Sequence, residues 1–288
     1  MARRKPSTVH GMLVIDKSSG VTSHDVVSML RKRLGERRIG HAGTLDPSAT
    51  GVLIIGVGKA TRLMRFATAS AKTYETEIVF GAETDTLDAD GEVVLRHKMS
   101  FSGDDLLNAA MKFLGEINQI PPMVSALKVG GRRLHELARE GIEIESEARK
   151  VRIDRFDLTP TENPLVWKAL VVCGPGTYVR SLGADLGKAL GGGAHITNLR
   201  RTASGSFTIA EAGPVDEAEL KPVGEMVRSM ARLVLDDSDV VKVRNGARLP
   251  SDMMLGEGPW ALFDEYGELV AVHERIEGFV KVGVVLPV

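Results

Sequence analysis

The stretch GHAGTLDPSATG at residues 40–51, followed by the apolar run VLIIGV at residues 52–57, is the most informative part of the sequence. Its glycines and Pro47 predict a turn-rich loop, and the apolar run predicts a buried strand. Asp46 lies in the middle of this loop, with His41 nearby. A loop held between rigid elements is a common place for function, but an aspartate before a proline can also simply cap a turn. Composition alone leaves both interpretations of Asp46 open.

Hydrophobic periodicity predicts a mixture of strands and helices around this loop. Strands are expected at residues 12–15, 52–57, 72–80, 151–158, 165–172, 196–199 and 206–209. Helices are expected at residues 23–34, 59–66, 104–114, 132–140 and 178–190. Thr22 or Ser23 would cap the first helix, and the acidic stretch Glu83–Asp90 is expected to be a loop.

The character of the sequence changes after about Leu235. Short apolar runs alternate there with Gly, Asp and Asn turns, at residues 240–243, 260–263, 269–273 and 280–286. This pattern predicts a small all-β module of about 50 residues. At the other end of the chain, residues 1–9 are expected to form a disordered basic tail.

The composition is that of an ordinary globular protein. Of the 288 residues, 43% are hydrophobic and 26% charged, which excludes wholesale disorder. Cys173 is the only cysteine, so neither an intrachain disulfide nor a multi-cysteine zinc site can form. No apolar run approaches the roughly 20 residues of a membrane span, and no apolar segment follows the basic N-terminus as it would in a secretory signal.

The net charge of −1 hides a marked asymmetry. Residues 1–80 hold 13 Lys/Arg and 6 Asp/Glu, whereas the remainder holds 24 and 32. Such an asymmetry is typical of a region that faces a polyanion within a nearly neutral protein. Chance clustering on a solvated face remains the alternative.

Several familiar site patterns fail here. The residues GVGKAT at 56–61 lack the spacing of a phosphate loop, and Gly174-Pro175-Gly176 lacks the third glycine of a dinucleotide fingerprint. No His, Asp or Glu cluster has the spacing of metal ligands. Cys173 could be a nucleophile with His195 as its base, but it follows an apolar run, which favours a buried strand position.

Arg180 stands near the start of the helix expected at residues 178–190. A cation there faces the positive end of the helix dipole, which is mildly unfavourable. A buried carboxylate partner would explain this position. The alternative is a surface arginine that pairs with Asp185.

The loop GHAGTLDPSATG with the following Val-Leu resembles the catalytic motif of the bacterial TruB-type tRNA pseudouridine synthase family. Further segments resemble that family's other motifs in the expected order: DKSSGVTS at 16–23, KTY at 72–74, QIPPMVSALK at 119–128 with LAREG at 137–141, GTYVRS at 176–181, and HITNLRR at 195–201. Together they cover about residues 11–205. The sequence departs from the family at Ser18, where proline is usual, and at Val124 and His135, where tyrosines are common.

The resemblance implies an α+β fold: a pseudouridine synthase catalytic domain at residues 10–234 on a mainly antiparallel central sheet. It also implies an RNA-clamping insertion at about residues 123–150 and a PUA-like RNA-binding domain at residues 235–288. We expect the insertion to be mobile in the free protein and ordered on RNA. We expect the C-terminal domain to contribute to RNA binding but not to the chemistry.

The implied activity is that of an isomerase that converts uridine 55, in the T arm of tRNA, to pseudouridine by flipping the base. By resemblance, Asp46 is the nucleophile, Arg180 its ion-pair partner, and Tyr74 the residue that stacks on the base. The residues matching those that contact the substrate are Lys17, His41, Tyr178 and Leu199. The basic residues expected to hold the RNA backbone are Arg31, Lys32, Arg33, Arg37, Arg38, Lys128, Arg132 and Arg133.

The resemblance implies neither a cofactor nor a metal. We expect a cytoplasmic monomer that binds tRNA, with no membrane contact and no obligate protein partner. Two other classes stay open from the residues alone. A non-catalytic RNA-binding protein would leave Asp46 and Arg180 apart in space, and a thiol hydrolase would need an exposed Cys173 beside His195.

Overall fold

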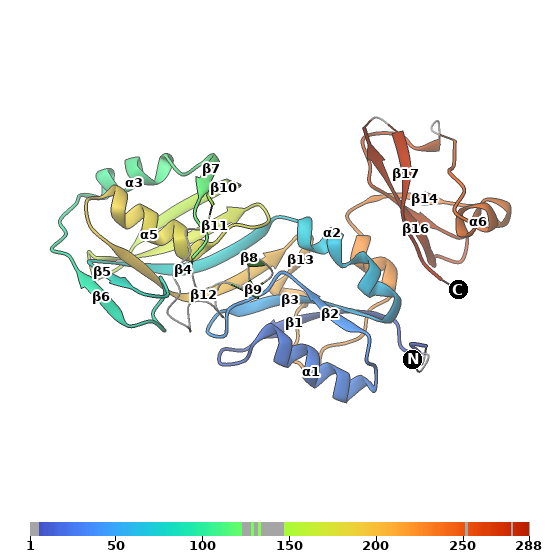
Figure 1. The fold of residues 1–288 in the computed structure, drawn as a ribbon, viewed down its shortest axis with the longest axis horizontal. Coiled ribbons are helices and arrows are strands. Elements are labelled where there is room, and N and C mark those ends of the chain that lie inside the picture. The colour runs from blue at the N-terminus through green and yellow to red at the C-terminus, as the bar shows by residue number, and fades with distance from the viewer. Residues whose placement is uncertain are drawn as a thin grey trace.

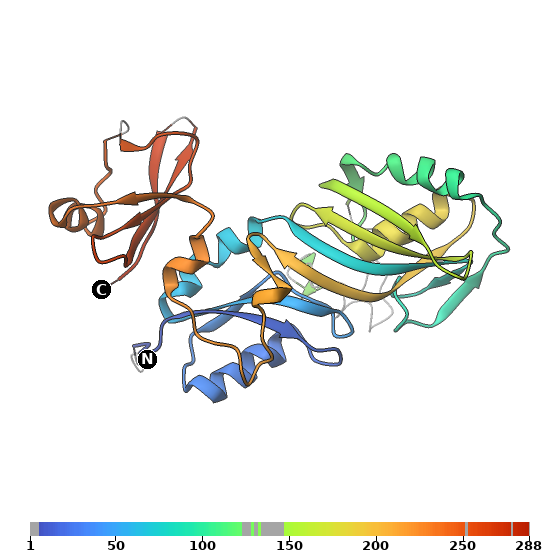
Figure 2. The same ribbon diagram turned by 180° about the vertical axis from the view of Figure 1, so that it is seen from behind.

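The computed structural model describes residues 6–122, 128–129, 132–133, 147–250, 253–277 and 279–287. A nine-stranded sheet forms the larger part of the molecule (Figure 1). A smaller four-stranded sheet lies at the end opposite to α3 (Gly103–Met111) and the hairpin of β5 (Ala82–Thr84) and β6 (Val93–Arg96), as Figures 1 and 2 both show. No helix in the described ranges is long and apolar enough to cross a membrane.

The central sheet is antiparallel between all neighbours except β3 and β12, which run parallel. Its main path is β1 (Gly11–Lys17), β3 (Thr50–Val57), β12 (Ala194–Ser204), β4 (Lys72–Phe80), β11 (Val166–Cys173), β10 (Arg149–Pro160) and β7 (Gly115–Gln119). The short strands β2 (Ile39–Ala42) and β13 (Phe207–Thr208) pair with β3 and β12. This confirms the expected mainly antiparallel sheet.

Both faces of β1 and β3 are buried, which explains why their sequences are continuously apolar. Alternate residues such as Leu13 and Leu53 contact the core beneath α1 (Ser23–Leu34), α3 (Gly103–Met111) and α5 (Val179–Ala189). The intervening residues, such as Val14 and Ile54, face a second core on the other side of the sheet. The sheet thus carries two layers of packing at the place where it holds the loop of Asp46.

The first helix begins where the sequence predicts. Thr22 is the N-cap of α1, and its hydroxyl and the Asp25 carboxylate form a reciprocal capping box. Val26, Val27 and Leu30 are buried on one face. Gly35 ends the helix in a left-handed conformation with φ of 63°, which favours glycine.

Three local expectations differ from the structure. The loop expected at residues 40–51 begins with a strand, because Ile39–Ala42 pairs with β3. The acidic stretch expected to be a loop contributes to a hairpin of β5 (Ala82–Thr84) and β6 (Val93–Arg96). The helix expected from Arg132 does not start there, because Arg132–Arg133 (β9) pairs with Lys128–Val129 (β8). The rest of that helix lies outside the described residues.

The tail expected to be disordered is partly fixed. Residues 1–5 lie outside the described part of the chain. The Ser7 hydroxyl donates a hydrogen bond of 3.2 Å to Glu36, and the Thr8 amide donates another of 3.1 Å to the same buried carboxylate. The segment is therefore held against the start of β2 by Glu36, which no sequence signal marked.

The C-terminal sheet has the order β14 (Ala231–Val234), β15 (Trp260–Phe263), β16 (Leu269–Ile276) and β17 (Phe279–Val285). The last three strands were predicted. The strand predicted at residues 240–243 is wrong, because α6 (Asp237–Arg244) is a helix that Asp236 caps. The sheet also starts at Ala231, before the expected domain boundary at residue 235.

The two sheets share a hydrophobic core. Phe263 and Leu269 of the C-terminal sheet belong to the same buried cluster as Val52, Ile54 and Leu63 of the larger part. Three helical turns complete this region: η1 (Gly58–Leu63), α2 (Met64–Ala69) and η3 (Val223–Val227), and a fourth, η2 (Ile209–Glu211), follows β13. The C-terminal sheet therefore cannot be removed without exposing apolar core surface of the larger part.

Candidate active site

Asp46 lies in the tight loop between β2 and β3. The loop begins at Gly43, whose φ of 74° is a left-handed conformation that favours glycine. On the other side, β3 runs back through the centre of the sheet. The carboxylate thus projects from a short connection between two paired strands.

Three buried side chains hold the backbone of this loop. Arg201 Nη2 donates a hydrogen bond of 2.9 Å to the Gly43 carbonyl. The Ser23 hydroxyl accepts from the Leu45 amide at 2.9 Å and donates to the Leu45 carbonyl at 3.2 Å. Lys17 Nζ donates to the Pro47 carbonyl at 3.0 Å. The loop is therefore fixed on both sides of Asp46, as a preorganised site requires.

Lys17 has a different role from the one expected. It is fully buried, and its Nζ donates to the carbonyls of Ser18, Val21 and Pro47. These three bonds use all three of its N–H groups. Burial lowers the pKa of Lys17 to about 8, against the opposing influence of Asp46. The buried position of Lys17 contradicts the expectation that it contacts substrate, and Lys17 instead supports the loop that carries Asp46 from inside.

Arg180 and Asp46, predicted as partners, lie together. Arg180 Nε is 3.0 Å from Asp46 Oδ2, and the arginine is only 3% exposed. This buried ion pair contradicts the alternative in which Arg180 pairs with Asp185 on the surface. It also contradicts the condition for a merely RNA-binding protein, which would leave the two residues apart.

A second carboxylate, which the sequence did not single out, approaches the same arginine. Asp88 Oδ2 is 3.6 Å from Arg180 Nε, and Arg180 Nη1 donates to the Thr86 carbonyl at 2.8 Å. Asp88 Oδ1 accepts from the Thr86 hydroxyl at 2.6 Å and from the Asp90 amide at 3.2 Å. The connection between β5 and β6 therefore helps to fix Arg180 beside Asp46.

The electrostatic balance at Asp46 is set by opposing influences. Burial of its carboxyl raises the pKa, the Arg180 charge lowers it, and the Asp88 charge raises it again. The net pKa of Asp46 lies above the usual value. Arg180 is therefore the group that most favours the ionised form of the Asp46 carboxyl.

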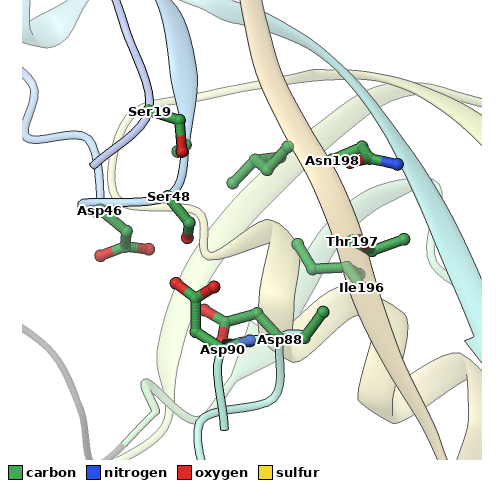
Figure 3. Close-up of a pocket in the computed structure, with 11 residues that line it drawn as sticks. Ser19, Asp46, Ser48, Asp88, Asp90, Ile196, Thr197 and Asn198 are labelled. Atoms are coloured by element: carbon green, nitrogen blue, oxygen red, sulfur yellow. Dashed lines mark hydrogen bonds between the residues drawn. The ribbon is translucent and has the colours of Figure 1, made fainter. Parts of the chain in front are cut away.

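Asp46 borders two cavities. The larger, of about 240 Å³, is also lined by Tyr74, Tyr178, Arg180 and Leu199. The smaller, of about 180 Å³, lies between the Asp46 loop, the β5–β6 connection and β12; Figure 3 shows its lining, with Asp46 and Ser48 on one side and Asp88 and Asp90 on another. The larger cavity brings together five of the residues that the sequence singled out.

A bulge in β12 places Leu199 in both cavities. The register of β12 against β4 shifts between Thr197 and Arg200, and Asn198 takes a left-handed φ of 56°. The Asn198 amide donates to Glu77 at 3.0 Å, which holds the bulge. Leu199 consequently lines the cavities rather than pairing in the sheet.

Tyr74 and Tyr178 are held by partners that the sequence did not reveal. Tyr74 is 9% exposed, and its hydroxyl lies 3.5 Å from Arg201 Nη1; burial raises its pKa. The buried side-chain amide of Gln119 accepts from the Tyr178 amide at 2.8 Å and donates to the Tyr178 carbonyl at 3.1 Å. Gln119 thereby fixes Tyr178, which occupies the N-cap position of α5 two residues before Arg180.

His41 lies in β2 and does not line either cavity beside Asp46. Its ring is edge-on to His24, with centroids 6.2 Å apart, and burial lowers its pKa. Its Nδ1 is buried without a hydrogen-bond partner in the described part of the chain. Contact of His41 with a substrate stays a prediction.

The basic residues at the end of α1 are exposed, but several are already hydrogen-bonded. Arg31 donates to the Arg37 and Ile39 carbonyls. Arg33 donates to two carbonyls of the segment at 215–218, and Arg38 donates to the Thr61 hydroxyl. The side chains expected to bind RNA from the insertion, on Lys128, Arg132 and Arg133, lie outside what the structure describes.

The thiol alternative is excluded by geometry. Cys173 is 1% exposed, and burial raises its pKa to about 11, so the thiolate does not form near neutral pH. His195 Nδ1 lies 2.9 Å from the Ala82 carbonyl, and no hydrogen bond joins His195 to Cys173 among the described residues. Cys173 is a structural core residue.

Comparisons with known proteins find the family that the sequence motifs resemble. Residues 31–179 match the TruB family pseudouridylate synthase N-terminal domain, and residues 180–232 match the tRNA pseudouridylate synthase B C-terminal domain. The chain is 45% identical to tRNA pseudouridine synthase B of Symbiobacterium thermophilum, over 83% of each chain. It is 42% identical to that of Bacillus pumilus, over 84% of each chain, and 41% identical to that of Mycobacterium tuberculosis, over 92% of each chain.

Solved structures show the same fold. A chain of a Cbf5-Nop10-Gar1 complex superposes with a TM-score of 0.72 at 24% identity, covering 96% of this chain and 84% of that one. A chain of an H/ACA RNP bound to a substrate RNA containing 2′-deoxyuridine gives 0.69 at 23% identity, with the same coverage. The fold is the α+β pseudouridine synthase fold, with a small C-terminal sheet consistent with a PUA-like domain. With these matches, the chain belongs to the TruB family of pseudouridine synthases.

Proposed function

We propose that the protein converts uridine 55, in the T arm of tRNA, to pseudouridine. The observation that carries this proposal is the 3.0 Å contact between Arg180 and Asp46 at a cavity that Tyr74, Tyr178 and Leu199 also line. The isomerisation needs a carboxylate nucleophile, a cation that keeps it ionised, and a surface that retains a detached base. The relatives are named for tRNA, which supports this class of RNA.

The reaction breaks the C1′–N1 bond, turns the base, and joins C1′ to C5. All atoms are retained, so no redox step is needed. Asp46 is the proposed nucleophile, attacking either C1′ of the ribose or C6 of the base, and Arg180 holds it in the ionised form. Tyr74 stacks on the base, which has left its stack in the RNA, and Leu199 and Tyr178 enclose it.

Phosphates are proposed to lie along the basic N-terminal region and the insertion at about 123–150. Lys32 and Arg37 lie exposed there, where they position the RNA without reading its sequence. We expect the protein to act as a cytoplasmic monomer without a cofactor. Hydrogen exchange tests the insertion, which should become protected when a T-arm RNA binds; equal protection with and without RNA would contradict the clamp.

The test is incubation with a T-arm stem-loop transcript, followed by mapping of pseudouridine. We expect one modified position, at uridine 55. A Cys173→Ser variant is the matched control and should modify the RNA as the wild type does, because the thiol is buried and does not line the cavity. Unchanged uridine 55 after complete incubation with wild-type protein would refute the proposed function.

A further inference from the structure

The larger cavity beside Asp46 is lined by more cations than its single described carboxylate can neutralise. Lys72, Arg180 and Arg201 all line it, and Asp46 is the only carboxylate among its described lining residues. Arg180 pairs with Asp46. Lys72 and Arg201 are 6% and 1% exposed, and in the described ranges neither has a carboxylate oxygen within 4.0 Å.

Arg201 is held by neutral acceptors. Its Nε donates to the Val52 carbonyl at 2.7 Å, and Nη2 donates to the Gly43 carbonyl at 2.9 Å. Nη1 lies 3.5 Å from the Tyr74 hydroxyl, and the guanidinium carbon is 6.0 Å from the centre of the Tyr74 ring. These contacts fix the guanidinium beside the ring on which the base is proposed to stack, but they leave its charge uncompensated.

Lys72 lies on the same face of β4, two residues before Tyr74. Its Nζ donates to the carbonyls of Thr68 and Ser70 at 2.6 and 2.5 Å, at the end of α2. Cations are favoured at helix C-termini, but α2 has only six residues, so the dipole offsets little of the charge. The charge of Lys72 is therefore also available to the cavity.

Burying a cation without a counter-ion is costly, and an anion that forms in the cavity would offset that cost. The proposed reaction makes one. On the C1′ route, the Asp46 carboxylate bonds to C1′ as the C1′–N1 bond breaks, and the electron pair of the broken bond stays on the base, delocalised over N1, O2 and O4. C5 then forms the new bond to C1′ and releases the Asp46 carboxylate, C5 loses its proton and N1 gains one, so the base carries the negative charge only between the two bond changes.

We propose that Arg201 and Lys72 stabilise the negative charge that develops on the uracil base when it separates from the ribose. This inference rests on the proposed function. Fixed charges aimed at the place where charge develops accelerate a step without needing to reorganise. A phosphate would suit the charge equally, but the aromatic and apolar lining from Tyr74, Tyr178 and Leu199 fits a planar base better.

The test compares Arg201→Gln with Arg200→Gln on two T-arm RNAs, one with uridine and one with 5-fluorouridine at the target. Fluorine withdraws electrons, so the fluorinated base anion needs less stabilisation from the protein. Arg200 is the matched control because it directly precedes Arg201 in β12 and lines neither cavity beside Asp46. Its Nη2 pairs instead with Asp16 Oδ2 at 2.7 Å. Single-turnover consumption of the target nucleotide is measured at saturating RNA.

We expect Arg201→Gln to slow uridine consumption about 100-fold, as loss of one stabilising donor does elsewhere, and to slow 5-fluorouridine consumption by less than about 10-fold. Any loss in Arg200→Gln should be equal for both RNAs. Equal losses in Arg201→Gln would mean that Arg201 only shapes the loop, and would overturn the inference. A weaker salt dependence of RNA binding would instead assign Arg201 to a phosphate and overturn it too.

Lys72→Met provides the second test if Arg201→Gln does not fold, and the same preferential loss on uridine is expected. Failure of wild-type protein to convert either RNA would refute the proposed function itself. An active wild type with equal losses in both cavity variants would refute only the stabilisation of the base anion.

Discussion

Lys17→Met should damage catalysis while leaving RNA binding and its salt dependence unchanged. The buried Nζ of Lys17 donates to the carbonyls of Ser18, Val21 and Pro47, and Pro47 follows Asp46 directly. Methionine fills a similar volume but cannot donate. The loop that carries Asp46 would lose its support, and a displacement of about 1 Å of a reacting group can cost about 100-fold in rate.

The expected change in stability follows from two opposing effects. Lys17→Met leaves the Ser18 and Val21 carbonyls without a donor among the described residues, at a cost of about 1–3 kcal/mol each, whereas the Pro47 carbonyl keeps the Gly20 amide as a donor. Against this, the pKa of Lys17 falls from 10.5 to about 8, so keeping it charged costs the folded state about 3 kcal/mol near neutral pH, and methionine removes that cost. The two effects nearly cancel, and we expect the free energy of unfolding to fall by no more than about 3 kcal/mol.

Two assays separate this account from a phosphate contact. Single-turnover pseudouridine formation at saturating T-arm RNA reports the position of Asp46, and the Kd over a range of salt reports phosphate contacts. Loss of a phosphate contact would reduce the slope of log K against log[salt] by about 1. Lys32→Met, exposed on α1, is the control that should show such a reduction with a normal rate. A reduced slope with a normal rate in Lys17→Met would refute the reasoning.

Three further outcomes are expected. Arg180→Lys should lose most activity, because lysine lacks the planar fork that contacts Asp46 and the Thr86 carbonyl together; near wild-type turnover would contradict this pairing. Arg180→Met should shift the acidic limb of the pH–rate profile to higher pH, because the arginine lowers the pKa of Asp46. A pH titration of the single-turnover rate in which this limb does not move would count against this prediction. Removal of residues from 231 onward should lower the Tm by about 10 °C or more, because Phe263 and Leu269 share a core with Val52; a truncated protein that melts like the full chain would show that the two sheets are independent.

The loss of stability that we expect on truncation differs from what the sequence suggests. The short strands after Leu235 indicate a separable module, and three of them are present. The sequence could not reveal that Phe263 and Leu269 pack against the back of β3, because long-range packing leaves no local pattern. For the same reason no local pattern marks Ala231–Val234 as the first strand of that sheet, and the expected boundary at residue 235 leaves this strand out of the C-terminal domain.

Elements with local signals were predictable, and those set by tertiary contacts were not. The first helix has its cap at Thr22 and its apolar face at Val26, Val27 and Leu30 within one short stretch. By contrast, Val240 and Val243 suggested a strand, because valine favours strands. The Asp236 cap and the burial of both valines in the C-terminal core determine a helix instead.

The residues of the candidate site likewise divide into those that the sequence indicated and those that it did not. The resemblance of motifs named Asp46, Arg180 and Tyr74, and the structure brings all three to one cavity. It did not indicate that Lys17 is buried, because a lysine at the end of a strand is ordinarily exposed. It also gave no reason to select Asp88 or Arg201, whose proximity to the site depends on how the connection between β5 and β6 lies against β12.

The central claim is that Asp46, held by Arg180, is the attacking carboxylate, and Asp46→Asn tests it most directly. The amide is nearly isosteric with the carboxylate but is not a nucleophile of this kind. In single-turnover mapping on a saturating T-arm RNA, we expect no pseudouridine at position 55 while the variant binds the RNA with a Kd close to that of the wild type. Pseudouridine formation within tenfold of the wild-type rate would contradict the claim.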